Sequence, residues 1–193
     1  MSMNKTTIFI SGANRGIGAG LVGAYLSRPS HTVIAAVRNP SHPTSTKLST
    51  LPVAAGSKLV LLRYDASAPS TAKAAVDELS SYGITKIDIV IANAGIAAYW
   101  GPVLSVPVSA IEEHYRINTV GSLVLYQVTW PLLASSKDPK FVYISTTLGS
   151  IGAMEDYPFN AVAYGSSKVA MNYIVKKAHL ENEKVTIFNL HPG

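Results

Sequence analysis

Cysteine is absent from the 193 residues. Its absence excludes disulfides, thiol nucleophiles and Cys-ligated zinc or iron–sulfur centres, and it fits a reducing, cytoplasmic location. No stretch approaches the ~18 apolar residues of a membrane span, so we expect no membrane partner. The five histidines are scattered without the spacing of metal ligands, and we therefore expect no metal site.

Acidic side chains are missing from the first third of the chain. Residues 1–64 carry seven Lys and Arg and no carboxylate, whereas residues 65–193 carry nine basic and eleven acidic side chains. A purely basic third indicates an anionic ligand. Because its cations are single and evenly spaced instead of forming a stripe, a small phosphorylated ligand is favoured over a nucleic acid.

Apolar residues make up 48% of the chain and charged residues 14%, which supports one well-buried core in a single domain, residues 1–193. Short β-branched apolar runs alternate with helical patterns along this domain. The runs predict strands at 6–11, 32–37, 58–64, 87–92, 140–145 and 185–190. The helical patterns cover 16–28, 44–54, 70–82, 110–134 and 161–181, with Ser109 and Glu112 as a capping box for the fourth.

Six strands alternating with five helices predict an α/β fold. The strands are solidly apolar, which is typical of a parallel sheet covered on both faces. The main choice is a Rossmann-like, doubly wound sheet with strand order 3-2-1-4-5-6 and helices on both faces. A (β/α)8 barrel would need two more units and about 250 residues, so it is rejected.

The first predicted strand runs directly into a glycine-rich turn, with a helix after it. Glycines in such a turn let the backbone approach a pyrophosphate, and the helix N-terminus offers free N–H groups and a positive dipole end. The spacing, Gly-x-x-x-Gly-x-Gly, differs from both the dinucleotide fingerprint and the phosphate-binding P-loop, and a turn without a ligand is the alternative. The candidate cofactor residues here are Gly12, Asn14, Arg15, Gly16, Ile17 and Gly18.

Arg38 directly follows the second predicted strand, where a site that prefers NAD has the carboxylate that accepts the ribose 2′-OH. Arg38 and Arg15 could instead meet a 2′-phosphate, to which Arg binds bidentately. The alternative is that Arg38 is an ordinary solvated residue at a strand end. The missing carboxylate is the stronger evidence, and the pattern predicts NADP(H).

The catalytic candidates are Tyr164 and Lys168, four residues apart on the last helix and therefore on one face. A nearby ammonium can lower the pKa of a phenol, and one cation at ~4 Å supplies about the 4 kcal/mol that a shift to neutrality needs. The spacing itself is weak evidence, because Tyr82/Lys86 and Tyr173/Lys177 share it. Only Tyr164 opens a helix after the fifth strand, near the edge where doubly wound sheets bind ligands.

Together these motifs resemble the short-chain dehydrogenase/reductase family over the whole chain. They look most like its carbonyl-reductase branch and, within it, the fungal norsolorinic acid ketoreductase-like proteins. The resemblance implies cofactor contacts by Asp65, by Asn93, Ala94 and Gly95, by Tyr164 and Lys168, and by Pro192 and Gly193. It also implies Tyr164 and Lys168 as the acid/base pair and Asn118 as the holder of a catalytic water. The family's substrate-polarising Ser aligns with Thr146, and the neighbouring Ser145 is the second choice.

We therefore expect an NADPH-dependent reductase of a ketone or aldehyde. Met154, Tyr157 and Phe159 should border a small apolar or aromatic substrate, although a plain surface loop explains them equally well. The alternative is an NADP(H)-binding module or regulator that has lost turnover. A nucleic-acid-binding chain is motivated by the pI of 9.4 alone.

The chain ends at Gly193, before the segment that touches the nicotinamide, the lid helices and the seventh strand implied by the resemblance. We expect the sixth strand to be left as an apolar sheet edge, because neither Lys nor Pro lies inside 185–190 to discourage edge pairing. Self-association through that edge is the expected consequence.

Overall fold

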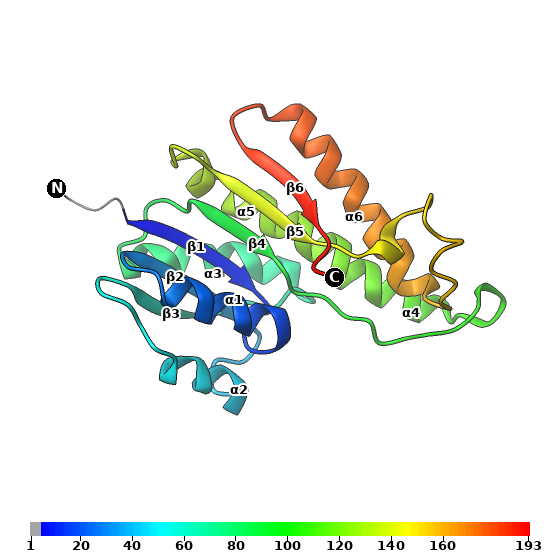
Figure 1. Cartoon of the computed structure of the whole chain (residues 1–193), viewed down its shortest axis with the longest axis horizontal. Helices are drawn as coiled ribbons and strands as arrows, with labels where there is room; N and C mark the ends of the chain where they lie inside the picture. Colours follow the sequence, from blue (N-terminus) through cyan, green and yellow to red (C-terminus); the bar gives the residue numbers. More distant parts are fainter. Residues whose placement is uncertain (1–4) are drawn as a thin grey trace.

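Six apolar segments form strands where the sequence predicts them. The computed structural model describes residues 5–193 and contains one parallel sheet in the order β3-β2-β1-β4-β5-β6 (Figure 1), which confirms the predicted order. The end strands of the sheet are β3 and β6. The strands are β1 (Thr6–Ser11), β2 (His31–Val37), β3 (Lys58–Arg63), β4 (Ile89–Ala92), β5 (Lys140–Ile144) and β6 (Thr186–Leu190).

The predicted helical stretches are present, and several divide into shorter segments. They are α1 (Gly16–Leu26), α2 (Pro43–Thr46), η1 (Lys47–Thr50), η2 (Pro69–Thr71), α3 (Ala72–Asp77), η3 (Glu78–Tyr82), η4 (Val103–Ser105), α4 (Val108–His114), η5 (Tyr115–Val120), α5 (Gly121–Ala134), η6 (Thr147–Gly149) and α6 (Val162–Glu181). The second stretch ends earlier than predicted because Leu51, extended at ψ 146°, precedes Pro52. The residue before a proline disfavours the helical region.

The predicted capping box at Ser109 and Glu112 is wrong. Helix α4 begins at Val108, its N-cap is Pro107, and no side chain caps it. The carbonyl oxygen of Pro107 already accepts the N–H of Ala110 at 3.0 Å, so Ser109 lies inside the first turn. An N-cap side chain must stand outside the helix to reach its free N–H groups, and Ser109 does not.

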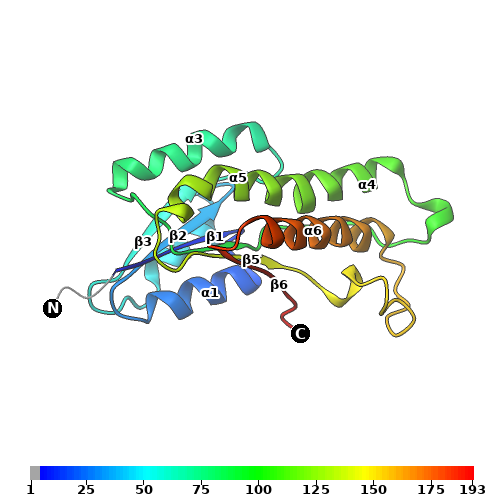
Figure 2. The same cartoon turned by 90° about the horizontal axis from the view of Figure 1, so that it is seen from above.

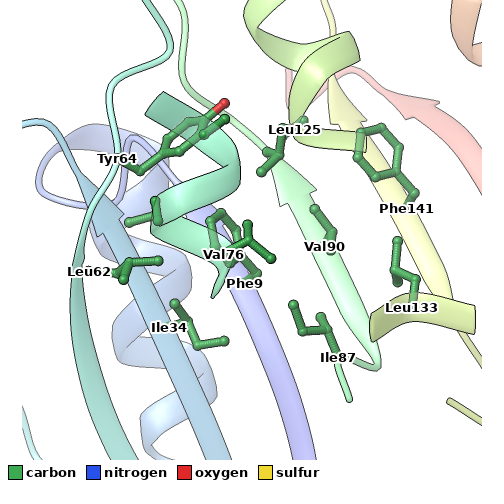
Figure 3. Close-up of a cluster of buried hydrophobic side chains, with 14 of the residues drawn as sticks. Phe9, Ile34, Leu62, Tyr64, Val76, Ile87, Val90, Leu125, Leu133 and Phe141 are labelled. Atoms are coloured by element: carbon green, nitrogen blue, oxygen red, sulfur yellow. The ribbon is translucent and has the colours of Figure 1, made fainter. Parts of the chain in front are cut away.

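The sheet separates two apolar cores. Helices α3, α5 and α6 cover one face, whereas α1 covers the other (Figure 2). Leu48 of η1 also packs into the core on the α1 side. Figure 3 shows the first core, in which Phe9 and Phe141 from the sheet meet Val76 of α3 and Leu125 of α5. Burial on both faces explains why the strands are apolar throughout, and it confirms the doubly wound arrangement with helices on both sides.

A π-helical segment, η5, joins α4 to α5 into one long helix. Such segments are rare, and they occur frequently at functional sites because the wider turn displaces one side chain from the regular pattern. Here the segment contains Asn118, which is fully buried. No helix in residues 5–193 has both the length and the apolar character needed to cross a membrane.

Candidate active site

The glycine turn after β1 is shaped by two left-handed residues. Gly12 and Gly16 have φ of +64° and +51°, which side chains rarely adopt. A Cβ on Gly12 would lie 2.9 Å from the Cα of Ala94, and one on Gly18 would lie 2.3 Å from the carbonyl oxygen of Gly12. Gly16 has open space beside it. Gly12 and Gly18 therefore allow the close packing of the turn, and Gly16 leaves its outer side accessible.

A pocket of about 560 Å³ extends from this turn across the carboxyl ends of the strands. Ten of the fifteen predicted cofactor residues line it: Gly12, Asn14, Arg15, Gly16, Ile17, Arg38, Asp65, Asn93, Ala94 and Gly95. Gly18, Tyr164, Lys168, Pro192 and Gly193 are not among its lining residues. Asn39, His42, Thr44, Tyr64, Ala66, Ser67, Ile96 and Ile117 also line it, and the sequence reasoning missed them.

The basic end of this pocket holds Arg15 and Arg38 together with His42 and Thr44. Thr44 links this corner to the glycine turn, because its Oγ1 accepts from Asn14 Nδ2 at 2.6 Å. Asp65 is the one carboxylate on the pocket wall. Its Oδ1 accepts from the N–H and Oγ of Ser67 at 2.9 and 2.7 Å. The residues present thus suit a dinucleotide that carries an additional phosphate.

The ends of β1 and β4 are joined beneath the pocket. Ser11 Oγ accepts from the backbone N–H groups of Asn93 and Ala94 at 3.1 and 3.0 Å. Asn93 Nδ2 in return donates to the carbonyl oxygens of Ser11 and Gly12 at 3.0 and 3.1 Å. Asn93 therefore fixes the glycine turn relative to the next strand.

Lys168 lies on α6 beside Gly95 of the pocket wall, and its side chain is buried. Its Nζ donates to the carbonyl oxygen of Ile144 at 2.8 Å and lies 4.6 Å from the centre of the Tyr143 ring. A Cβ on Gly95 would lie 3.6 Å from this Nζ, so the pocket wall at Gly95 adjoins Lys168. Burial lowers the pKa of Lys168 to about 8.

Tyr164 is half-buried, one turn before Lys168. Burial raises the pKa of its phenol, and a hydrogen bond with Thr146 opposes that effect. The Lys168 Nζ lies 5.6 Å from the centre of the Tyr164 ring. The lowering of the Tyr164 pKa by the Lys168 ammonium stays a prediction. The Trp100 ring lies 6.3 Å from that of Tyr164.

Asn118 uses its whole side chain to hold the segment after β4. Its Oδ1 accepts from the N–H of Ile96 at 2.8 Å, and its Nδ2 donates to Ile96 O and to Ser167 Oγ, both at 2.9 Å. Its carbonyl oxygen accepts from the buried hydroxyl of Tyr143 at 3.2 Å. Asn118 thus joins the pocket wall to α6, and its role with a catalytic water stays a prediction.

The two hydroxyl candidates after β5 differ in their partners. Thr146 meets the Tyr164 phenol, whereas Ser145 Oγ donates to Asn172 Oδ1 at 2.7 Å. Ser145 is buried, so its single proton is already committed. The geometry therefore favours Thr146 over Ser145 as the group beside a reacting oxygen.

Met154, Tyr157 and Phe159 line a second, mainly apolar pocket of about 430 Å³. Its wall on α6 consists of Val162, Gly165, Ser166 and Val169, and it includes neither Tyr164 nor Lys168 nor Thr146. The three residues are thus grouped with one another but not with the catalytic candidates. Their contact with a substrate stays a prediction.

Three residues near the catalytic candidates were not found from the sequence: Trp100, Tyr143 and Asn172. Asn172 follows Lys168 by four residues and Tyr164 by eight, so helical spacing could have placed Asn172 on the same helix face as these two residues. Trp100 and Tyr143 had no comparable signal, because their contacts depend on the pairing of distant segments.

A family model described as short chain dehydrogenase matches residues 6–193. The chain belongs to this family. Norsolorinic acid ketoreductase nor1 of Dothistroma septosporum is 43% identical over 193 residues, 98% of this chain and 72% of that protein. Norsolorinic acid ketoreductase of Aspergillus parasiticus is 39% identical over 98% of this chain and 70% of that protein.

Among solved structures, this short-chain dehydrogenase resembles NADPH-bound carbonyl reductase from chicken fatty liver. The TM-score is 0.86 at 28% identity, over 99% of this chain and 80% of the other. The family membership establishes an oxidoreductase of the short-chain dehydrogenase/reductase type, as the sequence motifs predict, and the relatives named here are ketoreductases and a carbonyl reductase.

Proposed function

We propose that this short-chain dehydrogenase reduces a ketone or aldehyde carbonyl to an alcohol with NADPH. The observation that carries the proposal is that Tyr164 forms a hydrogen bond with Thr146 and lies near Lys168, which adjoins Gly95 on the wall of a dinucleotide-sized pocket. Relatives named as ketoreductases and a carbonyl reductase support the same direction of reaction.

Each of the three side chains has a distinct task in this reduction. NADPH, when bound, supplies the hydride that adds to the carbonyl carbon. Tyr164 donates its proton to the carbonyl oxygen, and a raised pKa keeps that proton on the phenol at neutral pH. Thr146 donates a hydrogen bond to the same oxygen. The Lys168 ammonium stabilises the phenolate that remains on Tyr164.

The preference for NADPH over NADH rests on charge. Arg15 and Arg38 line the same pocket, and within residues 5–193 neither forms an ion pair with a carboxylate. A 2′-phosphate bound there would form charge-assisted hydrogen bonds with a guanidinium, worth about 1.5–3 kcal/mol.

The substrate we propose is a small apolar or aromatic ketone. Trp100 is 53% exposed, and its ring lies beside Tyr164, where a planar substrate could stack on it. The name norsolorinic acid ketoreductase, carried by two relatives that cover most of this chain, favours a ketone over an aldehyde.

Cofactor titration and turnover test the proposal together. NADPH should bind roughly 10- to 150-fold more tightly than NADH, and Arg38→Asp should reverse that order. Arg63→Asp is the matched control, since Arg63 ends the neighbouring strand but lies outside the pocket. NADPH oxidation is then followed with a panel of aromatic ketones. Equal affinities would refute the cofactor choice, and tight binding without turnover of any carbonyl would indicate an NADP(H)-binding module.

A further inference from the structure

We propose that Asn172 is a positioning residue that fixes Thr146 against Tyr164. The inference rests on the proposed function, because those two hydroxyls are the groups assigned to the reacting oxygen. Thr146 belongs to the segment after β5, whereas Tyr164 belongs to α6. A side chain that joins these two elements sets the distance between the hydroxyls.

The Asn172 amide fastens the segment on both sides of Thr146. Its Oδ1 accepts from Ser145 Oγ at 2.7 Å, directly before Thr146. Its Nδ2 donates to the carbonyl oxygen of Gly149 at 3.0 Å, three residues after Thr146. The segment that contains Thr146 is thereby attached to one α6 side chain at two points, one before and one after Thr146.

Two glycines bring the segment into direct contact with the helix. A Cβ on Gly149 would lie 2.9 Å from Asn172 Nδ2 and 3.0 Å from Lys168 Cβ. A Cβ on Gly165 would lie 2.8 Å from the carbonyl oxygen of Leu148. Because no side chain separates the two surfaces, a shift of the Asn172 anchor would move Thr146 relative to Tyr164.

The same contacts assign a different task to Ser145. Its buried hydroxyl donates to Asn172, so it holds the segment and does not serve as a second donor to the substrate. Misplacing a reacting group by about 1 Å can cost roughly 100-fold in rate. The loss of the Asn172 anchor should therefore lower kcat without changing the basic end of the cofactor pocket.

The test compares Asn172→Leu, which keeps the size but removes both bonds, with Asn182→Leu. Asn182 is the matched control because it caps the other end of α6, where its Nδ2 donates to Ala178 O at 2.9 Å. Asn172→Leu should lower kcat roughly 10- to 100-fold, with the NADPH dissociation constant within about twofold of the original. Asn182→Leu should leave both values within about twofold. An unchanged kcat in Asn172→Leu would overturn the inference.

Ser145→Ala provides a milder test if Asn172→Leu does not fold. It should lower kcat by roughly three- to tenfold. In the double variant, kcat should equal that of Asn172→Leu alone, because the Ser145 bond is already absent there. If the two losses in kcat were additive in the double variant, Ser145 and Asn172 would act independently, which would contradict a shared anchor. Rates are referred to the NADPH-binding fraction, so that a loss of folded protein is not read as a loss of kcat.

Hydrogen exchange separates this inference from the proposed function. In the protein without ligand, the amides of Leu148 and Gly149 bond to Thr146 at 3.3 and 3.1 Å. Asn172→Leu should accelerate their exchange by about tenfold or more, since the segment opens more readily. Faster exchange in an enzyme that reduces no carbonyl would refute the proposed function alone. Unchanged exchange would overturn the role of Asn172.

Discussion

Helix α6 contains the Tyr-x-x-x-Lys spacing twice, with opposite results. In its N-terminal half, Lys168 is 4% exposed, and its Nζ would lie 3.6 Å from a Cβ placed on Gly95 of the pocket wall. Farther along, Tyr173 is 70% exposed, and Lys177 pairs with Glu181 at 3.5 Å on the surface. Residues nine apart are separated by about two and a half turns, so the two tyrosines project from opposite sides of the helix. Spacing alone thus says nothing about which face meets the sheet.

The largest expected difference between the two pairs is in catalysis. Tyr164→Phe should lower carbonyl reduction by about 100- to 10,000-fold, because the transferable proton is lost while the ring remains. Tyr173→Phe should keep activity within about twofold. Steady-state rates with NADPH measure both, and binding of NADPH should survive in each. Comparable losses in the two variants would show that the wrong pair had been assigned.

The lysines should differ in how they affect stability as pH changes. The pKa of Lys168 is about 8 in the fold and 10.5 as its ordinary value. Between these values the unfolded chain binds more protons, so the free energy of unfolding rises with pH, by about 3 kcal/mol across the interval. Lys168→Met should lack this rise. Urea unfolding at pH 7 and pH 10 measures it.

Lys177→Met is the control for that measurement. Its ion pair with Glu181 is exposed on both sides, and such pairs contribute about 0.5 kcal/mol or less. The pH dependence of this variant should therefore match that of the original protein. A flat curve for the original protein would contradict the burial effect at Lys168.

The smallest expected effect distinguishes the packing of a glycine in α6 from that of a glycine in α1. Alanine usually stabilises a helix interior by up to about 1 kcal/mol relative to glycine. Gly165→Ala should instead destabilise by about 1–3 kcal/mol and lower kcat, because its Cβ would lie 2.8 Å from Leu148 O. Gly23→Ala in α1, where the added Cβ would meet no group outside the helix within 4 Å, should stabilise. Thermal unfolding of both variants measures whether alanine destabilises the fold at Gly165 and stabilises it at Gly23.

The strands and the glycine turn were predictable because each depends on a local pattern, and the strand order followed from the alternation of strands with helices along the chain. The apolar run at β1 and the turn at Gly12 and Gly16 lie within a dozen residues of each other. The start of α4 was wrong, since Pro107 and not Ser109 ends the preceding loop. A capping motif two residues too late fits the sequence equally well when the backbone is unknown.

The cofactor side of the candidate site was easier to predict than its substrate side. Arg15 and Arg38 are recognised by what the sequence lacks, a carboxylate near them. In contrast, the choice between Ser145 and Thr146 depends on Asn172, which is 27 residues from Ser145 along the chain. The face of α6 on which Met154 and Phe159 lie is set by how a long loop returns to the helix. Neither the Ser145–Asn172 contact nor the path of this loop can be read from a local sequence pattern.

Trp100 gives this protein an internal optical probe. The sequence has two tryptophans, and the other, Trp130, lies beside Tyr126 on α5. Indole emission overlaps the absorption of reduced nicotinamide, so excitation energy can pass from a tryptophan to a nearby cofactor. Because Trp100 is next to Tyr164, its emission should respond most strongly to events at the reacting end of the pocket. Replacing Trp130 with Phe would isolate that signal.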